Sequence, residues 1–268
     1  MYSVVILALN EERALPACLN SLSACKDIVV LDSGSSDRTQ VIAKAAGARV
    51  FSRAFDTFAG QRNHAQTSIE FRFPWVLHLD ADERLTPELD EECQGASARN
   101  DLDGFRIAPK MVFEGRWIPH CTDYPAYQAR FVRAPQFQFI QVGHGQREAP
   151  TMKLENLRQG YLHDLSIYGE EAWLAKHKRY AKDEASALLS ASDDSNWRGL
   201  FSADSLVRRR TLKQYSFRLP YRAVLRFVYQ YGLRGGFLDG RQGLRYCQLL
   251  ARYEAFISEE IKRLKASD

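Results

Sequence analysis

Short apolar runs alternate with helical patterns over about the first hundred residues of the chain. The segments between these runs carry apolar residues at helical spacing, as at Leu15, Leu19 and Leu22. Strand–helix alternation of this kind is typical of a parallel sheet with helices on both faces. We therefore predict an α/β fold with a mostly parallel, Rossmann-like sheet. The four runs that predict its buried strands are "YSVVILAL", "DIVVLD", "ARVF" and "WVLHLD".

The pattern changes in the later part of the chain. From Gly104 to about His163, shorter apolar runs are separated by proline and glycine, which predicts short strands. After Tyr168 the apolar spacing becomes helical. We expect one α/β domain over residues 1–165, whose two halves meet near residue 100, and a helical C-terminal extension over residues 166–268.

Polar clusters follow three of the predicted strands, at Asn10–Glu11, Asp32–Gly34 and Asp80–Asp82. Ligands of such sheets bind beyond the carboxyl ends of the strands, so these clusters should share one functional edge. Asp32 could accept a hydrogen bond from a ribose hydroxyl or a base N–H. Gly34 would let the chain turn tightly beside it.

The motif "DAD" places two carboxylates, Asp80 and Asp82, directly after a buried strand. Two like charges this close repel one another unless something positive lies between them. Mg²⁺ or Mn²⁺ would resolve this, because these ions take carboxylate oxygens and share their remaining positions with water and phosphates. A solvated acidic loop without a metal is the alternative interpretation.

Composition indicates an ordinary globular protein of 268 residues, with 45% hydrophobic and 26% charged residues. No apolar run approaches the roughly 18 residues that a membrane-spanning helix needs, and the first residues lack a basic leader. The five cysteines are odd in number and scattered, with no CxxC pair. These features favour a reducing cytoplasm.

The net charge of +4 is unevenly distributed. Residues 205–238 contain eight Lys or Arg and no acidic residue, so subtracting +8 from +4 leaves −4 for the rest of the chain. Aromatic residues are interleaved with these cations, which suits an anionic membrane surface or a phosphate-rich acceptor. A solvated helix face would explain the same pattern. We expect no nucleic-acid partner, because no recognised binding motif is present.

The first 85 residues contain the stretches "VVILALNEE", "IVVLDSGSSDRT", "FAGQRNHA" and "VLHLDADE". In their order and spacing, these four stretches resemble family-2 glycosyltransferases, which are inverting enzymes of the GT-A fold. The later "GYLHDLSIYGEEAWLAKHKRYAKDEA" and "GGFLDGRQGLRYCQLLARYEAF" are similar to the subgroup that adds sugars to lipopolysaccharide or lipooligosaccharide cores, such as its β-1,4-glucosyltransferases. The resemblance implies a nucleotide-sugar donor, with UDP-glucose or a similar hexose donor as the natural guess, and a glycan or lipid-linked glycan acceptor.

This resemblance also implies which residues hold the donor, in a nucleotide-sugar-binding half over residues 1–100. Arg62 and Asn63 would line the donor pocket, where the Arg62 guanidinium suits a diphosphate. Asn10, Glu11 and Asp32 would bind the base and ribose. The other residues expected to bind the nucleotide sugar are Leu9, Gly34 and Ala81.

The same resemblance implies a metal site that bridges the diphosphate. Asp82 would be the principal ligand of Mg²⁺ or Mn²⁺, and Asp80 would face the ribose or the metal. His163 would add a contact to the metal or the diphosphate. A structural histidine bonded to Asp164 or to the backbone is the alternative for His163.

Inverting transfer needs a general base, because the acceptor hydroxyl loses its proton as it attacks. This base should come from the acceptor half, over residues 101–165. The stretch "QVGHGQREAP" is the best candidate, and within it we favour Glu148, with His144 and then Asp123 after it. A surface partner of Arg147 or of another arginine is the alternative for Glu148.

Two other functions compete with sugar transfer. A nucleotidyltransferase usually shows a Gly-rich basic loop directly after the first strand, whereas this chain has "LNEERALP". A relative that binds nucleotide sugars without catalysis would keep the fold and lose turnover.

Overall fold

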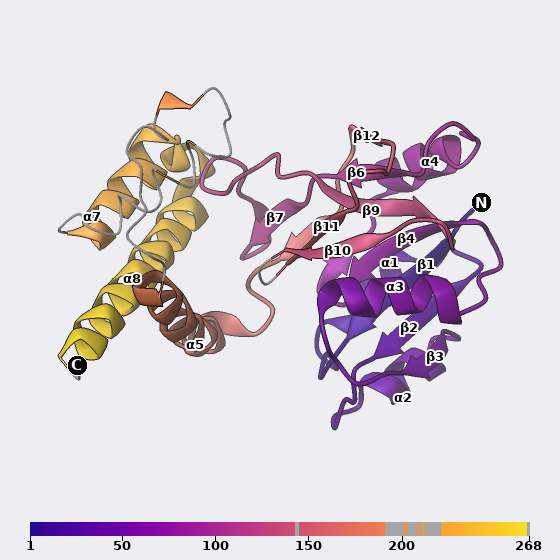
Figure 1. Cartoon of the computed structure of the whole chain (residues 1–268), viewed down its shortest axis with the longest axis horizontal. Helices are drawn as coiled ribbons and strands as arrows, with labels where there is room; N and C mark the ends of the chain where they lie inside the picture. The colour runs from indigo at the N-terminus through magenta and orange to yellow at the C-terminus, as the bar shows by residue number, and fades with distance from the viewer. Residues whose placement is uncertain (143–144, 191–200, 203–207, 209–210, 212–220, 267–268) are drawn as a thin grey trace. The chain divides into compact units, whose positions relative to one another are not determined.

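The computed structural model describes residues 1–142, 145–190, 201–202, 208, 211 and 221–266. The chain divides into two compact units (Figure 1). Unit 1 comprises Met1–Gly115 and Asp123–Ile167, and unit 2 comprises Arg116–Thr122 and Tyr168–Asp268.

A seven-stranded sheet forms the centre of unit 1, in the order β12-β6-β9-β4-β1-β2-β3. Strand β1 pairs in parallel with β2 and with β4, and β2 pairs in parallel with β3, as the apolar runs predict. Strand β9 lies antiparallel between β4 and β6, and β12 pairs in parallel with β6. The strands are β1 Ser3–Ala8, β2 Ile28–Asp32, β3 Arg49–Ser52, β4 Trp75–Asp80, β6 Gly104–Ile107, β9 Gln128–Arg133 and β12 Leu154–Asn156.

Helices cover both faces of this sheet because side chains alternate across each strand. On β1, Val4 and Ile6 join one core cluster, and Val5 joins the other. The first face packs against α1 (Leu15–Ser21), α2 (Thr39–Ala45) and α4 (Pro87–Ala96). The second face packs against α3 (Phe58–Ser68). The predicted α/β class with a mostly parallel sheet is therefore confirmed.

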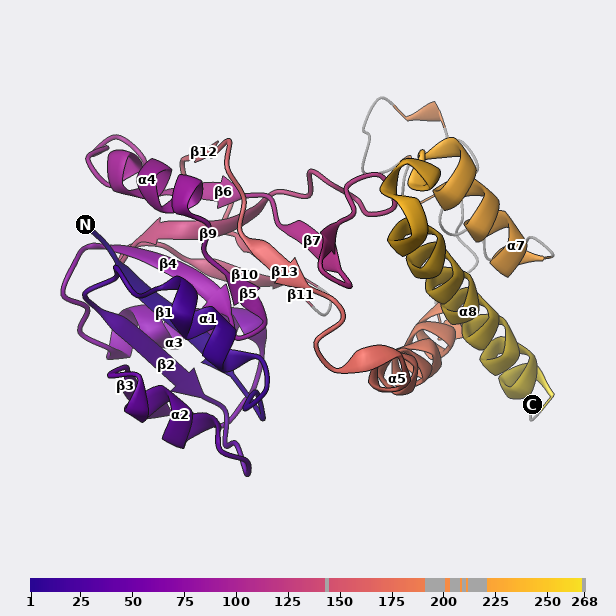
Figure 2. The ribbon, with the colours of Figure 1, turned by 180° about the vertical axis from the view of Figure 1, so that it is seen from behind.

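Two smaller groups of strands complete unit 1. Strands β10 (Phe139–Val142) and β11 (Gly145–Glu148) form a hairpin beside α3. Strand β13 (Leu162–Asp164) pairs with β5 (Glu83–Arg84) and with β7 (Lys110–Phe113), which Figure 2 shows from behind. The pairing of β13 with β5 brings the end of unit 1 back to the segment that follows β4.

Unit 2 is helical, which confirms the predicted character of the C-terminal region. Strand β8 (Arg116–Trp117) also belongs to it. Asp239 anchors residues 116–122, because its carboxylate accepts hydrogen bonds from the backbone N–H groups of His120 and Cys121, both at 2.9 Å. No helix in the described part of the chain is long and apolar enough to span a membrane. The helices are α5 Gly169–Ser190, α7 Arg222–Phe227, the π-helix η2 Val228–Leu233, the 3₁₀-helix η3 Gly236–Asp239 and α8 Gly240–Lys265.

Candidate active site

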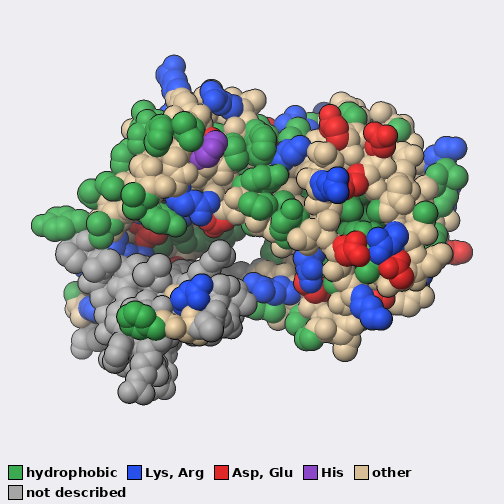
Figure 3. Space-filling view, turned by 90° about the horizontal axis from the view of Figure 1, so that it is seen from above, with side chains coloured by type: hydrophobic (Ala, Val, Ile, Leu, Met, Phe, Trp, Pro, Cys, Tyr) green, Lys and Arg blue, Asp and Glu red, His purple; other side chains and the backbone are tan. Residues whose placement is uncertain are grey.

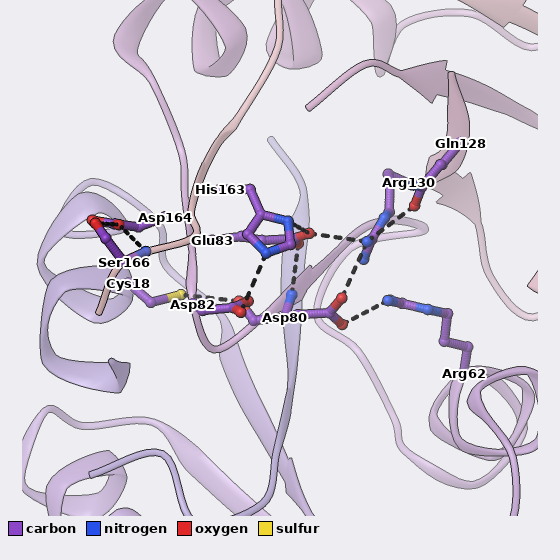
Figure 4. Close-up of polar contacts among 10 residues, drawn as sticks. All are labelled: Cys18, Arg62, Asp80, Asp82, Glu83, Gln128, Arg130, His163, Asp164 and Ser166. Carbon is purple, nitrogen blue, oxygen red and sulfur yellow. Dashed lines mark hydrogen bonds and ion pairs between the residues drawn. The ribbon is translucent and has the colours of Figure 1, made fainter. Parts of the chain in front are cut away.

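Three carboxylates gather where β4 ends (Figure 4). Asp80 closes β4, Asp82 lies in the turn, and Glu83 begins β5. The backbone N–H of Asp80 donates a 2.8 Å hydrogen bond to Glu83 Oε2, so the turn folds back on itself. The side chain of Glu83 is buried, whereas those of Asp80 and Asp82 are about 30% exposed. The "DAD" motif therefore presents its two aspartates at the carboxyl edge of the sheet.

Two buried arginines neutralise this turn. Arg62 extends from α3 to Asp80 Oδ1 at 2.7 Å. Arg130, from β9, contacts Asp80 Oδ2 at 3.1 Å and Glu83 Oε1 at 3.0 Å. Burial would raise the pKa of Asp80, but the charges of Arg130 and Arg62 hold that pKa well below its usual range. Both carboxylate oxygens of Asp80 are thus committed to guanidinium groups.

Glu83 experiences the opposite balance. Burial of Glu83 raises its pKa, and the positive charge of Arg130 lowers it. Burial is the larger effect, and together with the negative charge of Asp80 it raises the pKa of Glu83 to about 7.

His163 faces the same turn, because β13 places it opposite Glu83. Its Nε2 lies 3.3 Å from Asp82 Oδ2, and its Nδ1 lies 3.7 Å from Glu83 Oε1. Burial lowers the pKa of this imidazole, but the hydrogen bond and charge of Asp82 outweigh burial and raise the pKa of His163 to about 9. The structure therefore brings His163 next to Asp82, and in this state the imidazole carries a proton.

The donor set fits a divalent cation at Asp82 better than at Asp80. Mg²⁺ commonly takes one or two protein ligands and fills its other positions with water and substrate phosphates. Asp82 is partly exposed and contacts His163, which could lose its proton on ligation. Asp80 is engaged by two arginines, and the described residues contain no set of three His, Cys, Asp or Glu arranged as a metal site.

The predicted nucleotide-binding loops after β1 and β2 are joined to one another. Asp32 is fully buried, and its carboxylate accepts hydrogen bonds from the N–H groups of Gly34 and Ser35 at 3.0 and 2.9 Å. The backbone of Asn10 has a left-handed φ of 57°, and its side-chain oxygen accepts from the N–H of Ser36 at 2.9 Å. The N–H of Glu11 donates to Thr39 Oγ1 at 2.8 Å. In this structure Asp32 therefore shapes the loop instead of presenting its carboxylate to solvent.

The remaining predicted donor residues differ in their surroundings. Leu9 is 48% exposed and Ala81 is buried. The Asn63 amide bonds both backbone groups of Phe139, accepting from N–H at 2.9 Å and donating to C=O at 2.8 Å. Asn63 thus fastens β10 to α3, whereas the neighbouring Arg62 reaches the carboxylate turn.

Glu148, the favoured general base, is ion-paired with an arginine. Nε and an Nη of Arg106, on β6, lie 2.7 and 2.5 Å from Glu148 Oε1. Glu148 takes no part in the network of Figure 4. In this structure Glu148 is thus the ion-pair partner of an arginine, as in the alternative interpretation from the sequence. That arginine is Arg106 and not Arg147. His144 lies outside the described residues.

Sequence reasoning missed two members of the network, Glu83 and Arg130. Glu83 directly follows "DAD", so its position was a usable signal. Arg130 is a cation within the apolar strand "QARFVR", and its side chain is only 4% exposed. A buried arginine needs a carboxylate partner, which could have pointed to the DAD turn.

The family model "Glycosyl transferase family 2" matches residues 3–143, slightly more than half of the chain. The chain belongs to glycosyl transferase family 2. This confirms the resemblance read from the sequence. The matched range includes β1–β4, Arg62 and Arg130, but it ends before Glu148 and His163.

Curated proteins similar to this glycosyltransferase match over part of their length. The lipopolysaccharide core biosynthesis glycosyltransferase LpsC of Rhizobium meliloti is 37% identical over 119 residues, which cover 42% of this chain and 43% of LpsC. An uncharacterized glycosyltransferase of Rickettsia bellii is 33% identical over 104 residues, covering 38% of this chain and 35% of that protein. The chain thus matches less than half the length of these relatives.

Among solved structures, S. aureus TarS 1–349 in complex with UDP-GlcNAc is similar, with 15% sequence identity and a TM-score of 0.47. The alignment covers 98% of this glycosyltransferase and 91% of that chain. A glucosyl-3-phosphoglycerate synthase from Mycobacterium tuberculosis, in complex with Mn²⁺, UDP and glucosyl-3-phosphoglycerate, aligns with 25% identity and a TM-score of 0.35. That alignment covers 43% of this chain and 44% of the other.

Proposed function

We propose that this glycosyltransferase transfers a hexose, from UDP-glucose or a similar donor, to a glycan acceptor of the lipopolysaccharide core, with inversion at the anomeric carbon. The observation that carries the proposal is the carboxylate turn after β4, held by Arg62 and Arg130 and faced by His163. The similarity to LpsC supports the choice of acceptor class.

In this proposal the donor's diphosphate lies over the turn, with Asp82 and His163 as the side chains that hold Mg²⁺ or Mn²⁺. When bound, the ion supplies positive charge that offsets the charge developing on the departing nucleoside diphosphate. The role of Asp80 is to fix the turn, because its two ion pairs tie the end of β4 to α3 and β9. This rigidity keeps Asp82 aimed at the donor instead of letting the two aspartates separate.

The nucleoside would lie along the joined loops after β1 and β2. Asn10, Glu11 and Gly34 border this position, with Leu9 and Ala81 beside them. Asp32 supports this nucleoside position indirectly. Its buried carboxylate fixes the backbone of Gly34 and Ser35 in the loop after β2. Asn63 supports the pocket from behind through Phe139.

Glu148 is the proposed base that takes the proton of the acceptor hydroxyl. Its carboxylate is paired with Arg106, so the acceptor complex must loosen or replace that contact. Glu148→Gln should abolish transfer while donor binding stays nearly unchanged. Glu155→Gln is a matched control, because Glu155 is also paired with an arginine, at 3.1 Å from Arg99. Full turnover by the Glu148→Gln enzyme would move the base elsewhere.

The metal assignment is tested by thermal-shift measurements of UDP and UDP-glucose binding with and without Mn²⁺. Asp82→Asn should remove the Mn²⁺-dependent part of the shift. Asp164→Asn provides the control, because Asp164 is adjacent to His163 but its carboxylate caps Ser166 and pairs with Arg84 at 3.7 Å. A wild-type shift that ignores Mn²⁺, with product formation that resists chelators, would remove the metal from the proposal.

We place the reaction in the cytoplasm, at the inner face of the membrane where a lipid-linked acceptor would be available. Product formation from UDP-glucose and a core-glycan acceptor, with a β linkage established by NMR, tests the transfer itself. An α-linked product would contradict inversion, and binding without turnover would favour a non-catalytic relative.

A further inference from the structure

Unit 2 exposes an apolar stripe along α7 and η2. Val224, Leu225, Val228 and Tyr229 follow one another at intervals of one, three and one residues, which is the spacing of one side of a helix. Tyr221 precedes α7, and Leu233 ends η2. Leu233 and Tyr221 are each 80% exposed. The apolar stripe consists of Tyr221, Val224, Leu225, Val228, Tyr229 and Leu233.

Two polar residues of the same segment are buried. Arg222 is 9% exposed and pairs with Glu254 of α8, and Gln230 is 1% exposed. A surface helix of a globular protein usually turns its apolar stripe toward the core and its polar residues toward water. Here the aliphatic residues of the stripe are exposed, whereas Arg222 is buried against α8.

The exposed apolar surface continues into η3, where Phe237 and Leu238 are 53% and 55% exposed. A contiguous group of exposed apolar side chains is more typical of an interaction surface than of a surface that faces only water. Figure 3 shows hydrophobic side chains gathered on unit 2, at the left of the view, with basic side chains beside them.

Charge indicates which partner suits the apolar stripe. Unit 2 contains 20 Lys or Arg and 12 Asp or Glu, a net charge of +8, whereas unit 1 carries −4. Arg226 and Arg234 occur within the stripe's segment and are partly exposed. Part of the basic stretch 205–238 lies outside the described residues. The structural observations on this surface therefore come from residues 221–238 alone.

We propose that the apolar stripe lies on an anionic bilayer surface. The segment would lie parallel to the membrane, with the aliphatic side chains at the acyl boundary and the arginines among lipid phosphates. Tyr221 and Tyr229 suit this depth, because a phenol ring joins an apolar body to a polar tip. The proposed membrane contact does not depend on the proposed transfer reaction. An experiment can therefore contradict one proposal and leave the other standing.

Flotation of the full chain with vesicles tests this inference. The vesicles are phosphatidylcholine alone or phosphatidylcholine with phosphatidylglycerol, at low and at about 0.15 M ionic strength. The wild type should bind the anionic vesicles, and less tightly at the higher salt. Leu225→Glu with Leu233→Glu should weaken binding by roughly tenfold or more.

A matched control separates the stripe from a general loss of apolar surface and charge. Val41→Glu with Leu189→Glu also replaces two exposed aliphatic residues, 59% and 41% exposed, with glutamate. This control should bind like the wild type. Leu225→Ser with Leu233→Ser should also weaken binding, because it removes apolar contact without adding charge.

Three results would overturn the proposal. The first is no binding of the wild type to anionic vesicles at low salt. The second is equal binding by the stripe and control variants. The third is a wild-type dimer in sedimentation that the stripe variant dissociates, with no vesicle binding, which would assign the stripe to a second copy of the chain.

Discussion

Replacing Arg130 by methionine should destabilise unit 1 far more than the same change at an exposed arginine. Arg130 is 4% exposed and holds Asp80 and Glu83 at 3.1 and 3.0 Å. Its removal leaves Glu83 buried without an arginine partner, whereas Asp80 keeps Arg62. Breaking a buried pair from one side costs about 3–5 kcal/mol, and because Arg62 remains we expect the lower end, about 3 kcal/mol.

The assay is thermal unfolding of the full chain by calorimetry at neutral pH. For a unit of about 160 residues, ~3 kcal/mol corresponds to a fall in Tm of roughly 6–12 °C. Arg99→Met is the matched control, because Arg99 also contacts two carboxylates, Asp101 at 2.6 Å and Glu155 at 3.1 Å, but is 40% exposed. We expect a much smaller loss from that change, because water screens an exposed ion pair.

A second substitution checks the cause. Glu83→Gln in the Arg130→Met background removes the buried charge and keeps an oxygen that can accept from the Asp80 N–H. It should recover about 1 kcal/mol or more of the lost stability. The reasoning would be refuted if Arg130→Met were no worse than Arg99→Met, or if Glu83→Gln made the Arg130 variant less stable still.

Three further predictions concern stability. Burial opposes the ionisation of Asp27, but hydrogen bonds from Ser3, the Arg72 N–H and Arg49 lower its pKa in the folded protein. The ionised carboxylate therefore stabilises the fold at pH values above the pKa of Asp27 in the unfolded chain. This stabilisation is lost as the pH falls through the lower pKa of the folded state. Asp27→Asn should therefore cost about 2 kcal/mol at pH 7 and progressively less below about pH 4, as measured by unfolding at both pH values; a penalty independent of pH would contradict this. Asp239→Ala should detach residues 116–122 from η3, and hydrogen exchange at the His120 and Cys121 amides should accelerate, with unchanged exchange in β1 as the control. Asn63→Ala should destabilise by about 1–3 kcal/mol and expose the Phe139 amide to exchange, whereas Thr67→Ala on the same helix should not affect that amide.

The sequence by itself determined the layout of unit 1. Apolar runs of strand length and the helical spacing between them predicted β1–β4 and the helices on both faces, because these periodicities follow from local backbone geometry. The order of its motifs also led to the glycosyltransferase family, which the family match confirms. The position of Asp80 and Asp82 at the carboxyl edge followed from the same local argument, because a residue that ends a parallel strand can only lie at that edge.

Only the tertiary structure decided what those residues contact. Arg130 is 50 positions from Asp80 along the chain, and His163 reaches Asp82 through the pairing of β13 with β5. Asn63, expected in the donor pocket, bonds the backbone of Phe139, and Glu148 bonds Arg106. A polar side chain can pair with any of several distant partners, and the fold selects one by bringing two elements together. The exposed apolar stripe at 221–233 has the same origin, because the apolar pattern predicts an amphipathic helix but not which surface covers its apolar face.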